Sequence, residues 1–290
     1  MKKGRIMGLL DGKVALITGG ARGQGRAHAV ASAREGADIV VVDIDHQIDT
    51  VPYPLSAASD LAETVRQVEE LDRRVLSFEA DVRDQAALDH VVSETLASFG
   101  QIDILIANAG ILSLSPLWEM SEQMWSDMID TNLTGVWKSI KAVAPHMIER
   151  QTGSIVITSS INGLEPAQSY AHYTSAKHGL IGLMRSAALE LAPYGIRANT
   201  VNPGAIRTGM TDNPTMWDML GGHQGSTADE AYESARHFHA LKGAGLLPPE
   251  VIANAAVFLN SELASAVTGV VLPVDAGHMI LPGINMAPVV

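Results

Sequence analysis

A tyrosine and a lysine four residues apart are the side chains in this sequence best suited to proton transfer. Tyr173 and Lys177 would lie one helical turn apart on the same face of a helix. A phenol titrates near about pH 10, and a neighbouring ammonium group favours the phenolate and lowers that pKa. Tyr173 could then exchange a proton with an alcohol or a ketone, while Ser160 hydrogen-bonds the same substrate oxygen. The pair alone is weak support for this chemistry, because such spacing on a helix usually marks a solvated face.

A glycine-rich loop forms a second candidate site. Residues 13–18 have the apolar pattern of a buried parallel strand, residues 26–35 predict a helix, and residues 38–42 predict a second strand that ends at Asp43. A dinucleotide-binding loop requires this order of strand, loop, helix, strand and acid, although a purely structural glycine turn is the alternative. In such a loop, glycines let the backbone approach a pyrophosphate at the helix N-terminus. The glycines concerned are Gly19, Gly23 and Gly25.

The alternation of strands and helices continues along the chain. A helix that begins at Ser121 is expected to contain Asn132 and to bend near Pro145. No linker interrupts the pattern, so we expect one doubly wound α/β Rossmann domain over residues 1–290, with a seven-stranded parallel sheet and helices on both faces. The five further strands are predicted at residues 74–80, 102–107, 155–159, 196–201 and 270–274.

Three segments do not fit the regular alternation. Residues 44–59 form an insertion that is either a plain surface loop or a flap near the adenosine end of a cofactor, and Asp60 and Glu63 should then start a helix. Residues 205–245 are rich in Met, His and Trp, which favours an apolar substrate lid. Their histidines fit no standard metal spacing, so we expect no metal site. Residues 278–290 form a C-terminal tail.

The composition excludes several classes of partner. The 290 residues carry a formal charge of -12, and this acidic balance disfavours binding to nucleic acid or to an anionic membrane. There is no cysteine, which excludes disulfides and fits a reducing compartment. Residues 1–10 are too short for a secretory signal, and no apolar run is long enough to span a bilayer. We therefore expect a soluble cytoplasmic protein.

Taken together, these motifs resemble those of the classical short-chain dehydrogenase/reductases over residues 10–277. The resemblance implies that Tyr173 is the general acid/base and that Ser160 polarises the substrate oxygen. It implies that Lys177 binds the nicotinamide ribose and lowers the tyrosine pKa, and that Asn132 holds a water in a proton relay. The catalytic residues expected are Asn132, Ser160, Tyr173 and Lys177.

The same resemblance implies a nicotinamide cofactor. Asp43 favours NAD, because a carboxylate there would repel a 2′-phosphate, whereas Arg22 occupies a position where NADP users of the family often carry a basic residue. We give Asp43 more weight because it occupies the place that the phosphate would need. Asp81 and Asn108 would contact the cofactor, although either residue could equally be an ordinary loop cap. The expected cofactor-binding residues are Gly19, Arg22, Gly23, Gln24, Gly25, Asp43, Asp81, Val82, Asn108, Ala109, Gly110, Tyr173, Lys177, Pro203, Gly204, Ile206 and Thr208.

The insertion narrows the resemblance to one subfamily. The stretches A-R-G-Q-G, V-D-I-D and V-P-Y-P-L are similar to those of carveol dehydrogenases and mycofactocin-coupled oxidoreductases. This implies a small apolar secondary alcohol, such as a terpenoid, and a tightly held NAD beneath the insertion. It also implies a homotetramer built on the helices that contain Asn132 and Tyr173.

Two alternatives remain open at this point. One is an NADP-dependent ketoreductase acting on acyl-thioester or steroid ketones, which Arg22 favours and Asp43 opposes. The other is a non-catalytic nucleotide-binding protein built on the same fold. We rank this second alternative last, because all four expected catalytic positions are filled.

Overall fold

Seven parallel strands form a single sheet at the centre of the molecule. The structure, a computed structural model, describes residues 8–289. The strands lie in the order β3-β2-β1-β4-β5-β6-β7, so the predicted doubly wound α/β fold is confirmed. Their bounds are β1 Val14–Thr18, β2 Asp38–Asp43, β3 Val75–Glu79, β4 Ile104–Ala107, β5 Gly153–Thr158, β6 Ile196–Pro203 and β7 Val271–Val274.

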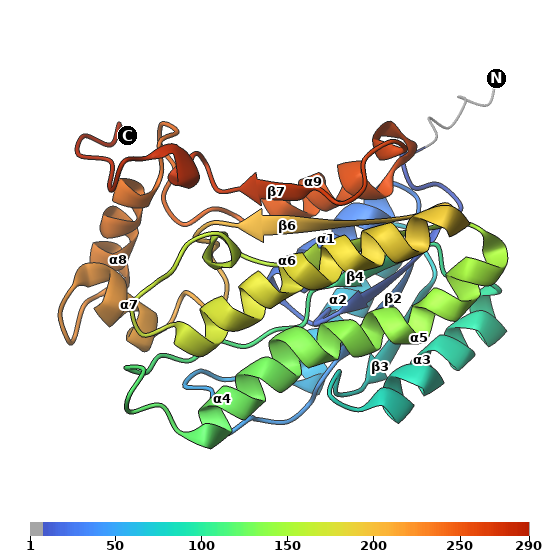
Figure 1. Cartoon of the computed structure of the whole chain (residues 1–290), viewed down its shortest axis with the longest axis horizontal. Coiled ribbons are helices and arrows are strands. Elements are labelled where there is room, and N and C mark those ends of the chain that lie inside the picture. The colour runs from blue at the N-terminus through green and yellow to red at the C-terminus, as the bar shows by residue number, and fades with distance from the viewer. Residues whose placement is uncertain (1–7, 290) are drawn as a thin grey trace.

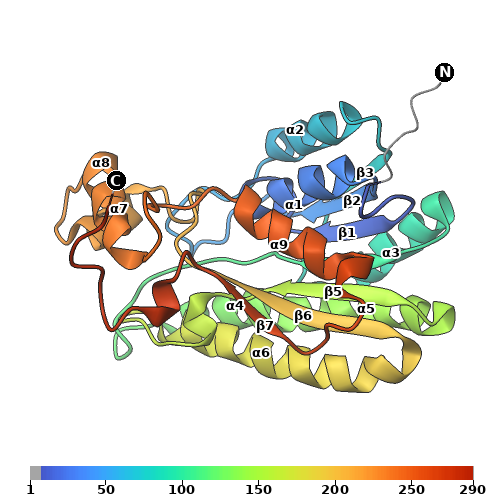
Figure 2. The ribbon, with the colours of Figure 1, turned by 90° about the horizontal axis from the view of Figure 1, so that it is seen from above.

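Helices cover both faces of this sheet (Figures 1 and 2). Helices α1, α2 and α9 lie on one face, and α3, α4, α5 and α6 lie on the other. Helices α7 and α8 pack together at one end of the molecule, away from both layers. The bounds are α1 Gly23–Arg34, α2 Ala58–Glu69, α3 Gln85–Phe99, α4 Glu122–Ile129, α5 Gly135–Arg150, α6 Ala171–Leu191, α7 Pro214–Gly221, α8 Ala228–Ala235 and α9 Glu250–Asn260.

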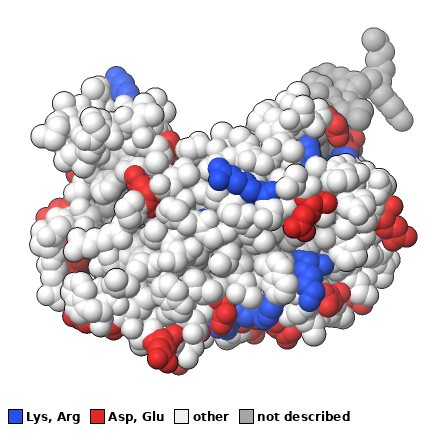
Figure 3. Space-filling model, in the orientation of Figure 1, with Lys and Arg blue, Asp and Glu red and all other residues white. Residues whose placement is uncertain are grey.

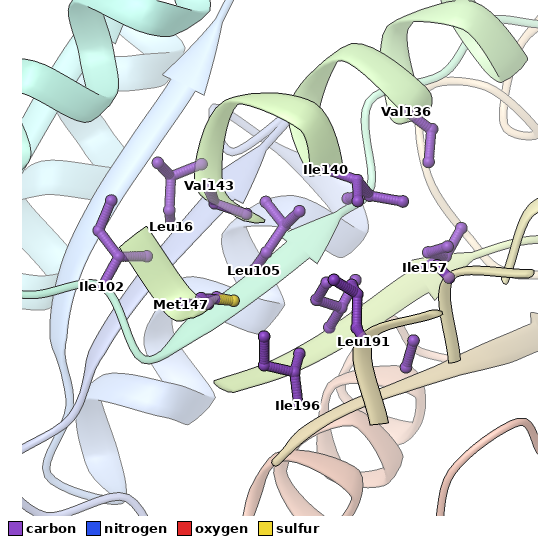
Figure 4. Close-up of a cluster of buried hydrophobic side chains, with 14 of the residues drawn as sticks. Leu16, Ile102, Leu105, Val136, Ile140, Val143, Met147, Ile157, Leu191 and Ile196 are labelled. Atoms are coloured by element: carbon purple, nitrogen blue, oxygen red, sulfur yellow. The ribbon is translucent and has the colours of Figure 1, made fainter. Parts of the chain in front are cut away.

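Neighbouring strand residues supply the two separate cores on the faces of the sheet. Leu16 belongs to the core beneath α3, α5 and α6, whereas Ile17, the next residue, belongs to the core beneath α1, α2 and α9. Side chains alternate across a strand, so a strand buried on both faces is apolar throughout. Figure 4 shows part of the first core, where Leu105 of β4 and Ile157 of β5 lie beneath Ile140 of α5.

The sheet opens a crevice where its chain order reverses. β1 pairs with β2 on one side and with β4 on the other, and open α/β sheets bind ligands at the carboxyl ends of such strands. Asn108, just after β4, joins these two strand ends. Its side-chain amide donates to the Thr18 carbonyl at 3.2 Å, and its backbone N–H donates to the Thr18 hydroxyl at 3.1 Å.

The helix expected after Ser121 is not regular. Ser121 caps α4 as predicted, since its hydroxyl accepts from the Met124 N–H at 3.1 Å. However, Asp130–Thr134 is a π-helical segment, and α5 then continues through Pro145. The wider turn brings Asn132 inward, where both ends of its side-chain amide bond to the backbone of Ile111. The helix expected from Ser121 therefore does contain Asn132, but its α-helical geometry is interrupted at that residue.

The predicted start of α2, at Asp60, was wrong. The helix begins at Ala58 rather than after Asp60. The Asp60 carboxylate accepts from the Ala57 N–H at 3.1 Å, so it caps the helix from inside its first turn. Glu63 instead pairs with Arg66 on the helix surface.

The segment predicted as a lid contains two short helices. Asn213 caps α7 by accepting from the Met216 N–H at 3.2 Å, and Thr227 and Glu230 form a capping box at the start of α8. The C-terminal tail packs against this segment, because Asn285 donates to the His239 carbonyl at 2.9 Å. Residues 1–7 and Val290, which belong to the predicted N-terminal segment and tail, lie outside the described residues.

A buried carboxylate connects the amino ends of β1 and β4. Asp103 is 5% exposed, accepts from the Val14 N–H at 2.8 Å and pairs with Arg150 at 2.9 Å. Asp103→Ala should lower the free energy of unfolding by about 2–4 kcal/mol, because it leaves a buried N–H without a partner. Urea unfolding measures this. Glu63→Ala, which removes an exposed ion pair, should leave the midpoint unchanged, and equal midpoints for both variants would contradict the assignment.

Candidate active site

A cavity of about 520 Å³ lies at the carboxyl ends of the strands. Segments that follow the first six strands, β1 to β6, line it, together with α6, the insertion and the segment predicted as a lid. All the predicted site residues except Asn132 contribute to its wall. These are Gly19, Arg22, Gly23, Gln24, Gly25, Asp43, Asp81, Val82, Asn108, Ala109, Gly110, Ser160, Tyr173, Lys177, Pro203, Gly204, Ile206 and Thr208.

Tyr173, Lys177 and Ser160 come together at the inner end of this cavity. Tyr173 and Lys177 lie on successive turns of α6, and the two residues are only 8% and 4% exposed. The Lys177 ammonium donates to the Thr158 carbonyl at 2.8 Å and lies 5.5 Å from the centre of the Tyr173 ring. Ser160 follows β5 and lines the same cavity, and its side chain is close enough to Tyr173 to lower the tyrosine pKa. The three groups can therefore act on one substrate oxygen.

Burial shifts both titrating groups toward their neutral forms. It raises the pKa of Tyr173 to about 12, although the Ser160 side chain opposes this rise. Burial also lowers the pKa of Lys177 to about 7. In the protein by itself, burial thus raises the pKa of Tyr173, and the expected lowering of this pKa by Lys177 stays a prediction.

Asn132 lies behind the cavity wall. It is fully buried, donates to the Ile111 carbonyl at 2.9 Å and accepts from the Ile111 N–H at 2.8 Å. A Cβ on Gly110 would lie 3.4 Å from the Asn132 oxygen and 3.8 Å from the Lys177 nitrogen. Asn132 thus fixes the loop after β4 next to Lys177, and its water-relay role stays a prediction.

The glycine loop forms a close-fitting cradle at the start of α1. Gly19 and Gly23 have positive φ angles of 67° and 54°, which favour glycine. A Cβ on Gly25 would lie 1.8 Å from the Gly19 carbonyl oxygen, so a side chain has no room there. The N-terminus of α1 has no side-chain cap, which leaves its N–H groups available to an anion. These features fit the pyrophosphate of a dinucleotide.

Asp43 and Arg22 have different partners. The Asp43 carboxylate, at the end of β2, accepts from the Ala21 N–H at 2.9 Å and from the Ser56 hydroxyl at 2.7 Å. Burial raises the pKa of Asp43, although these hydrogen bonds and the Arg22 charge oppose it. The Arg22 guanidinium donates to the Pro54 carbonyl, so it is engaged by the insertion.

The insertion is an organised segment of the cavity wall. The Gln47 side chain donates to three carbonyls of the insertion, including that of Tyr53 at 3.2 Å. Thr50 donates to Asp127 of α4 at 2.7 Å, which ties the insertion to the opposite layer. The insertion was predicted to be either a plain surface loop or a flap near the adenosine end of a cofactor. In fact its residues reach from Asp43 to the neighbourhood of Tyr173.

Sequence reasoning missed several residues of the cavity. Tyr170 packs edge-on against Tyr173 with 5.8 Å between ring centres. Glu165 and His278 pair at 2.5 Å across the cavity rim, although 113 residues separate them in the chain. No local pattern could have found these contacts, because they depend on how the loops fold back over the sheet. Asp81 lines the cavity as expected, and the pKa of its carboxyl is lowered by bonds from Arg83, which outweigh its burial.

Comparison with known proteins identifies the family. A protein-family model described as short chain dehydrogenase matches residues 13–218 of this chain. The chain belongs to the short-chain dehydrogenase family. This dehydrogenase is 41% identical over 273 residues to a (-)-trans-carveol dehydrogenase of Rhodococcus erythropolis. The aligned region covers 93% of this chain and 99% of the relative.

Two solved structures resemble the dehydrogenase closely. A carveol dehydrogenase from Mycobacterium avium in complex with NAD has a TM-score of 0.91 and 42% identity, covering 94% of this chain and 100% of the other. A short chain dehydrogenase from Mycobacterium paratuberculosis bound to NAD has a TM-score of 0.85 and 38% identity, with coverage of 94% and 100%. The resemblance inferred from the motifs is thereby confirmed.

Two features are absent from residues 8–289. Within them, no group of three or more His, Cys, Asp or Glu side chains is arranged to hold a metal ion. None of the helices described there has the length and apolar character needed to cross a bilayer.

Proposed function

We propose that the protein is an NAD-dependent oxidoreductase that interconverts a secondary alcohol and a ketone. The observation that carries the proposal is the meeting of Ser160, Tyr173 and Lys177 beside a glycine cradle in one cavity. NAD, when bound, supplies the group that accepts or returns the hydride. Membership of the short-chain dehydrogenase family supports the same reaction class.

The residues then have separate roles. Tyr173 takes the proton from the alcohol oxygen or returns it to the ketone oxygen. Ser160 bonds that oxygen and orients it, and Lys177 holds the nicotinamide ribose beside the phenol. Asn132 fixes the loop after β4, and we propose that it also holds the water of a proton relay. Glycines 19, 23 and 25, with Asp43, Asp81 and the segment 203–208, hold the rest of the cofactor.

NAD is supported over NADP by the partners of two side chains. Asp43 presents a carboxylate where a 2′-phosphate would have to lie, and such a phosphate would be repelled. Arg22 does not oppose this choice, because its guanidinium is engaged by the Pro54 carbonyl. The NAD complexes of two similar structures support the same cofactor. Neither the NADP-dependent ketoreductase nor the non-catalytic alternative gains comparable support.

The substrate we propose is a small apolar secondary alcohol of terpenoid type. Methionine and aromatic side chains dominate the outer cavity, which suits a flexible apolar pocket. Residues 205–245 would act as the lid of this pocket. We propose that the lid and the rest of the chain form a single domain. The carveol dehydrogenase relatives support this substrate class. The apolar side chains concerned are Tyr53, Ile111, Leu112, Tyr170, Met210, Met216, Met219, Leu220, Phe238 and Leu246.

We also propose that NAD would be held tightly beneath the insertion, as the resemblance to mycofactocin-coupled oxidoreductases implies. Two hydrogen bonds attach the insertion to its surroundings, one from Arg22 to the Pro54 carbonyl and one from the Ser56 hydroxyl to Asp43. They support a closed cover over the cofactor site. After exhaustive dialysis and denaturation, the purified protein should release NAD at close to one molecule per chain. Release of NADP would contradict the cofactor assignment. Release of no nucleotide would contradict tight retention but not the reaction.

A homotetramer in the cytoplasm is the assembly we propose. Trp125 of α4, Trp137 of α5 and Leu189 of α6 are 42%, 45% and 78% exposed. These three helices lie on the side of the molecule that faces the viewer in Figures 1 and 3, where most of the surface belongs to uncharged residues. Such a surface suits burial against further copies of the chain. Light scattering should give the mass of four chains, and Trp137→Glu should reduce it. A monomer at micromolar concentration would contradict the assembly. The cysteine-free sequence supports the cytoplasmic location.

The pH dependence of the reaction should follow Tyr173. Its pKa is raised to about 12, so the phenolate fraction grows about tenfold per pH unit below that value. We therefore expect kcat/KM for alcohol oxidation to rise about tenfold per unit from about pH 8 to about pH 10. Ser160→Ala should shift this rise of kcat/KM to higher pH, because it removes the side chain that lowers the tyrosine pKa. Oxidation that slows as pH rises would exclude Tyr173 as the base.

A further inference from the structure

Tyr53 carries the insertion into the reaction chamber. The side chain is 5% exposed and lines the cavity. It belongs to a buried apolar cluster that also contains Tyr173, Tyr170, Leu112 and Met216. Its position is therefore beside the catalytic tyrosine and the lid, rather than at the adenosine end of the site.

The hydroxyl of Tyr53 holds a second point on the loop after β4. It accepts from the Leu112 N–H at 3.0 Å. The preceding N–H, that of Ile111, donates to Asn132 at 2.8 Å. Two consecutive amides next to the reaction centre are thus fixed by two side chains, one from the catalytic set and one from the insertion.

The hydroxyl also keeps a proton to donate. Burial, together with the nearby Tyr173 phenol, raises the pKa of Tyr53, so its O–H stays protonated. The bond from Leu112 uses its acceptor capacity, not its donor. Within residues 8–289, no hydrogen bond takes up this proton, and the side chain borders the cavity. The donor is therefore available to a ligand in the chamber.

We propose that Tyr53 contacts the substrate and sets the size of alcohol that the chamber accepts. Its ring forms the insertion's side of the pocket, next to Met216 of the lid segment, and its hydroxyl fixes Leu112 against the substrate's apolar body. One segment then both covers the cofactor and selects the substrate. The inference rests on the proposed function, because it names a further residue of the same site.

Three variants test this role. Tyr53→Phe keeps the ring and removes the hydroxyl, and it should lower kcat/KM about five- to twentyfold for every alcohol accepted. Tyr53→Ala opens the pocket, so the kcat/KM ratio of a bicyclic to a monocyclic secondary alcohol should rise at least about tenfold. Thr50→Val is the matched control. It removes a different bond that holds the insertion, the one to Asp127, and should leave that ratio unchanged.

Two measurements separate this inference from the proposed function. Hydrogen exchange of the Leu112 amide should accelerate in Tyr53→Phe and not in Thr50→Val. Calorimetric binding of the two alcohols to the nucleotide-loaded protein should show the same change of preference in Tyr53→Ala, even if the wild type turns over neither. If Tyr53→Ala shows this change of binding preference but the wild type turns over neither alcohol, the proposed reaction is overturned and the role of Tyr53 is not. An unchanged preference in Tyr53→Ala, or an equal change in Thr50→Val, would overturn the role of Tyr53.

Discussion

Replacing Tyr173 with phenylalanine is expected to lower kcat about a thousandfold while nucleotide binding is retained. In the proposed mechanism the phenol exchanges a proton with the substrate oxygen, and it lies buried in the cavity wall near Ser160. The ring itself remains in the variant, so the packing around α6 should be preserved. Initial rates of alcohol oxidation and nucleotide content after denaturation measure the two properties separately.

Tyr170 provides the matched control for this variant. It is the neighbouring tyrosine, its ring packs edge-on against that of Tyr173, and its hydroxyl contacts the Met219 sulfur at 3.3 Å. Tyr170→Phe removes an equivalent hydroxyl from the same chamber and should change kcat less than about threefold. If Tyr173→Phe kept most of its activity, or if both variants lost activity equally, the assignment of Tyr173 as the acid/base would be wrong.

Gly25→Ala is expected to abolish nucleotide binding. The added Cβ would lie 1.8 Å from the Gly19 carbonyl oxygen, so the loop backbone must move away from α1. That movement disrupts the cradle in which free N–H groups meet the pyrophosphate. We expect the nucleotide released on denaturation to fall below about a tenth of the wild-type amount. The variant should also unfold at a lower urea concentration.

A second glycine substitution controls for this change. A Cβ on Gly245 would make only ordinary contacts, the nearest being the Tyr232 carbonyl oxygen at 3.6 Å. Gly245→Ala should therefore retain its nucleotide. Normal nucleotide content in Gly25→Ala would mean that the loop is a structural turn and that the cofactor binds elsewhere.

Local patterns were sufficient to predict the fold and the main residues of the site. Buried parallel strands are short apolar runs, and all seven were found, although β6 extends to Pro203. The spacing of Tyr173 and Lys177 corresponds to one turn of α6, which places both at the cavity. Parallel strands end at a common edge, so residues that follow different strands had to converge there.

Features that depend on tertiary contacts could not be predicted. The π-helical turn at Asn132 places that side chain against the backbone of Ile111, which is 21 residues away in the sequence. The partner of Arg22 lies in the insertion, whose path is set by Gln47 and by the bond between Thr50 and Asp127. The helices of the lid are a different case. Capping signals at Asn213 and at Thr227 were present in the sequence and could have predicted both.

The most direct test of the central claim follows the hydride itself. A secondary alcohol such as carveol, deuterated at its carbinol carbon, is incubated with the enzyme and, in separate reactions, with NAD or NADP, and the ketone and the nucleotide are analysed by mass spectrometry. We expect one deuterium in the reduced nicotinamide for each ketone formed, and none with Tyr173→Phe. Ketone formed without deuterium in the nucleotide, or transfer only to NADP, would contradict an NAD-dependent alcohol dehydrogenase.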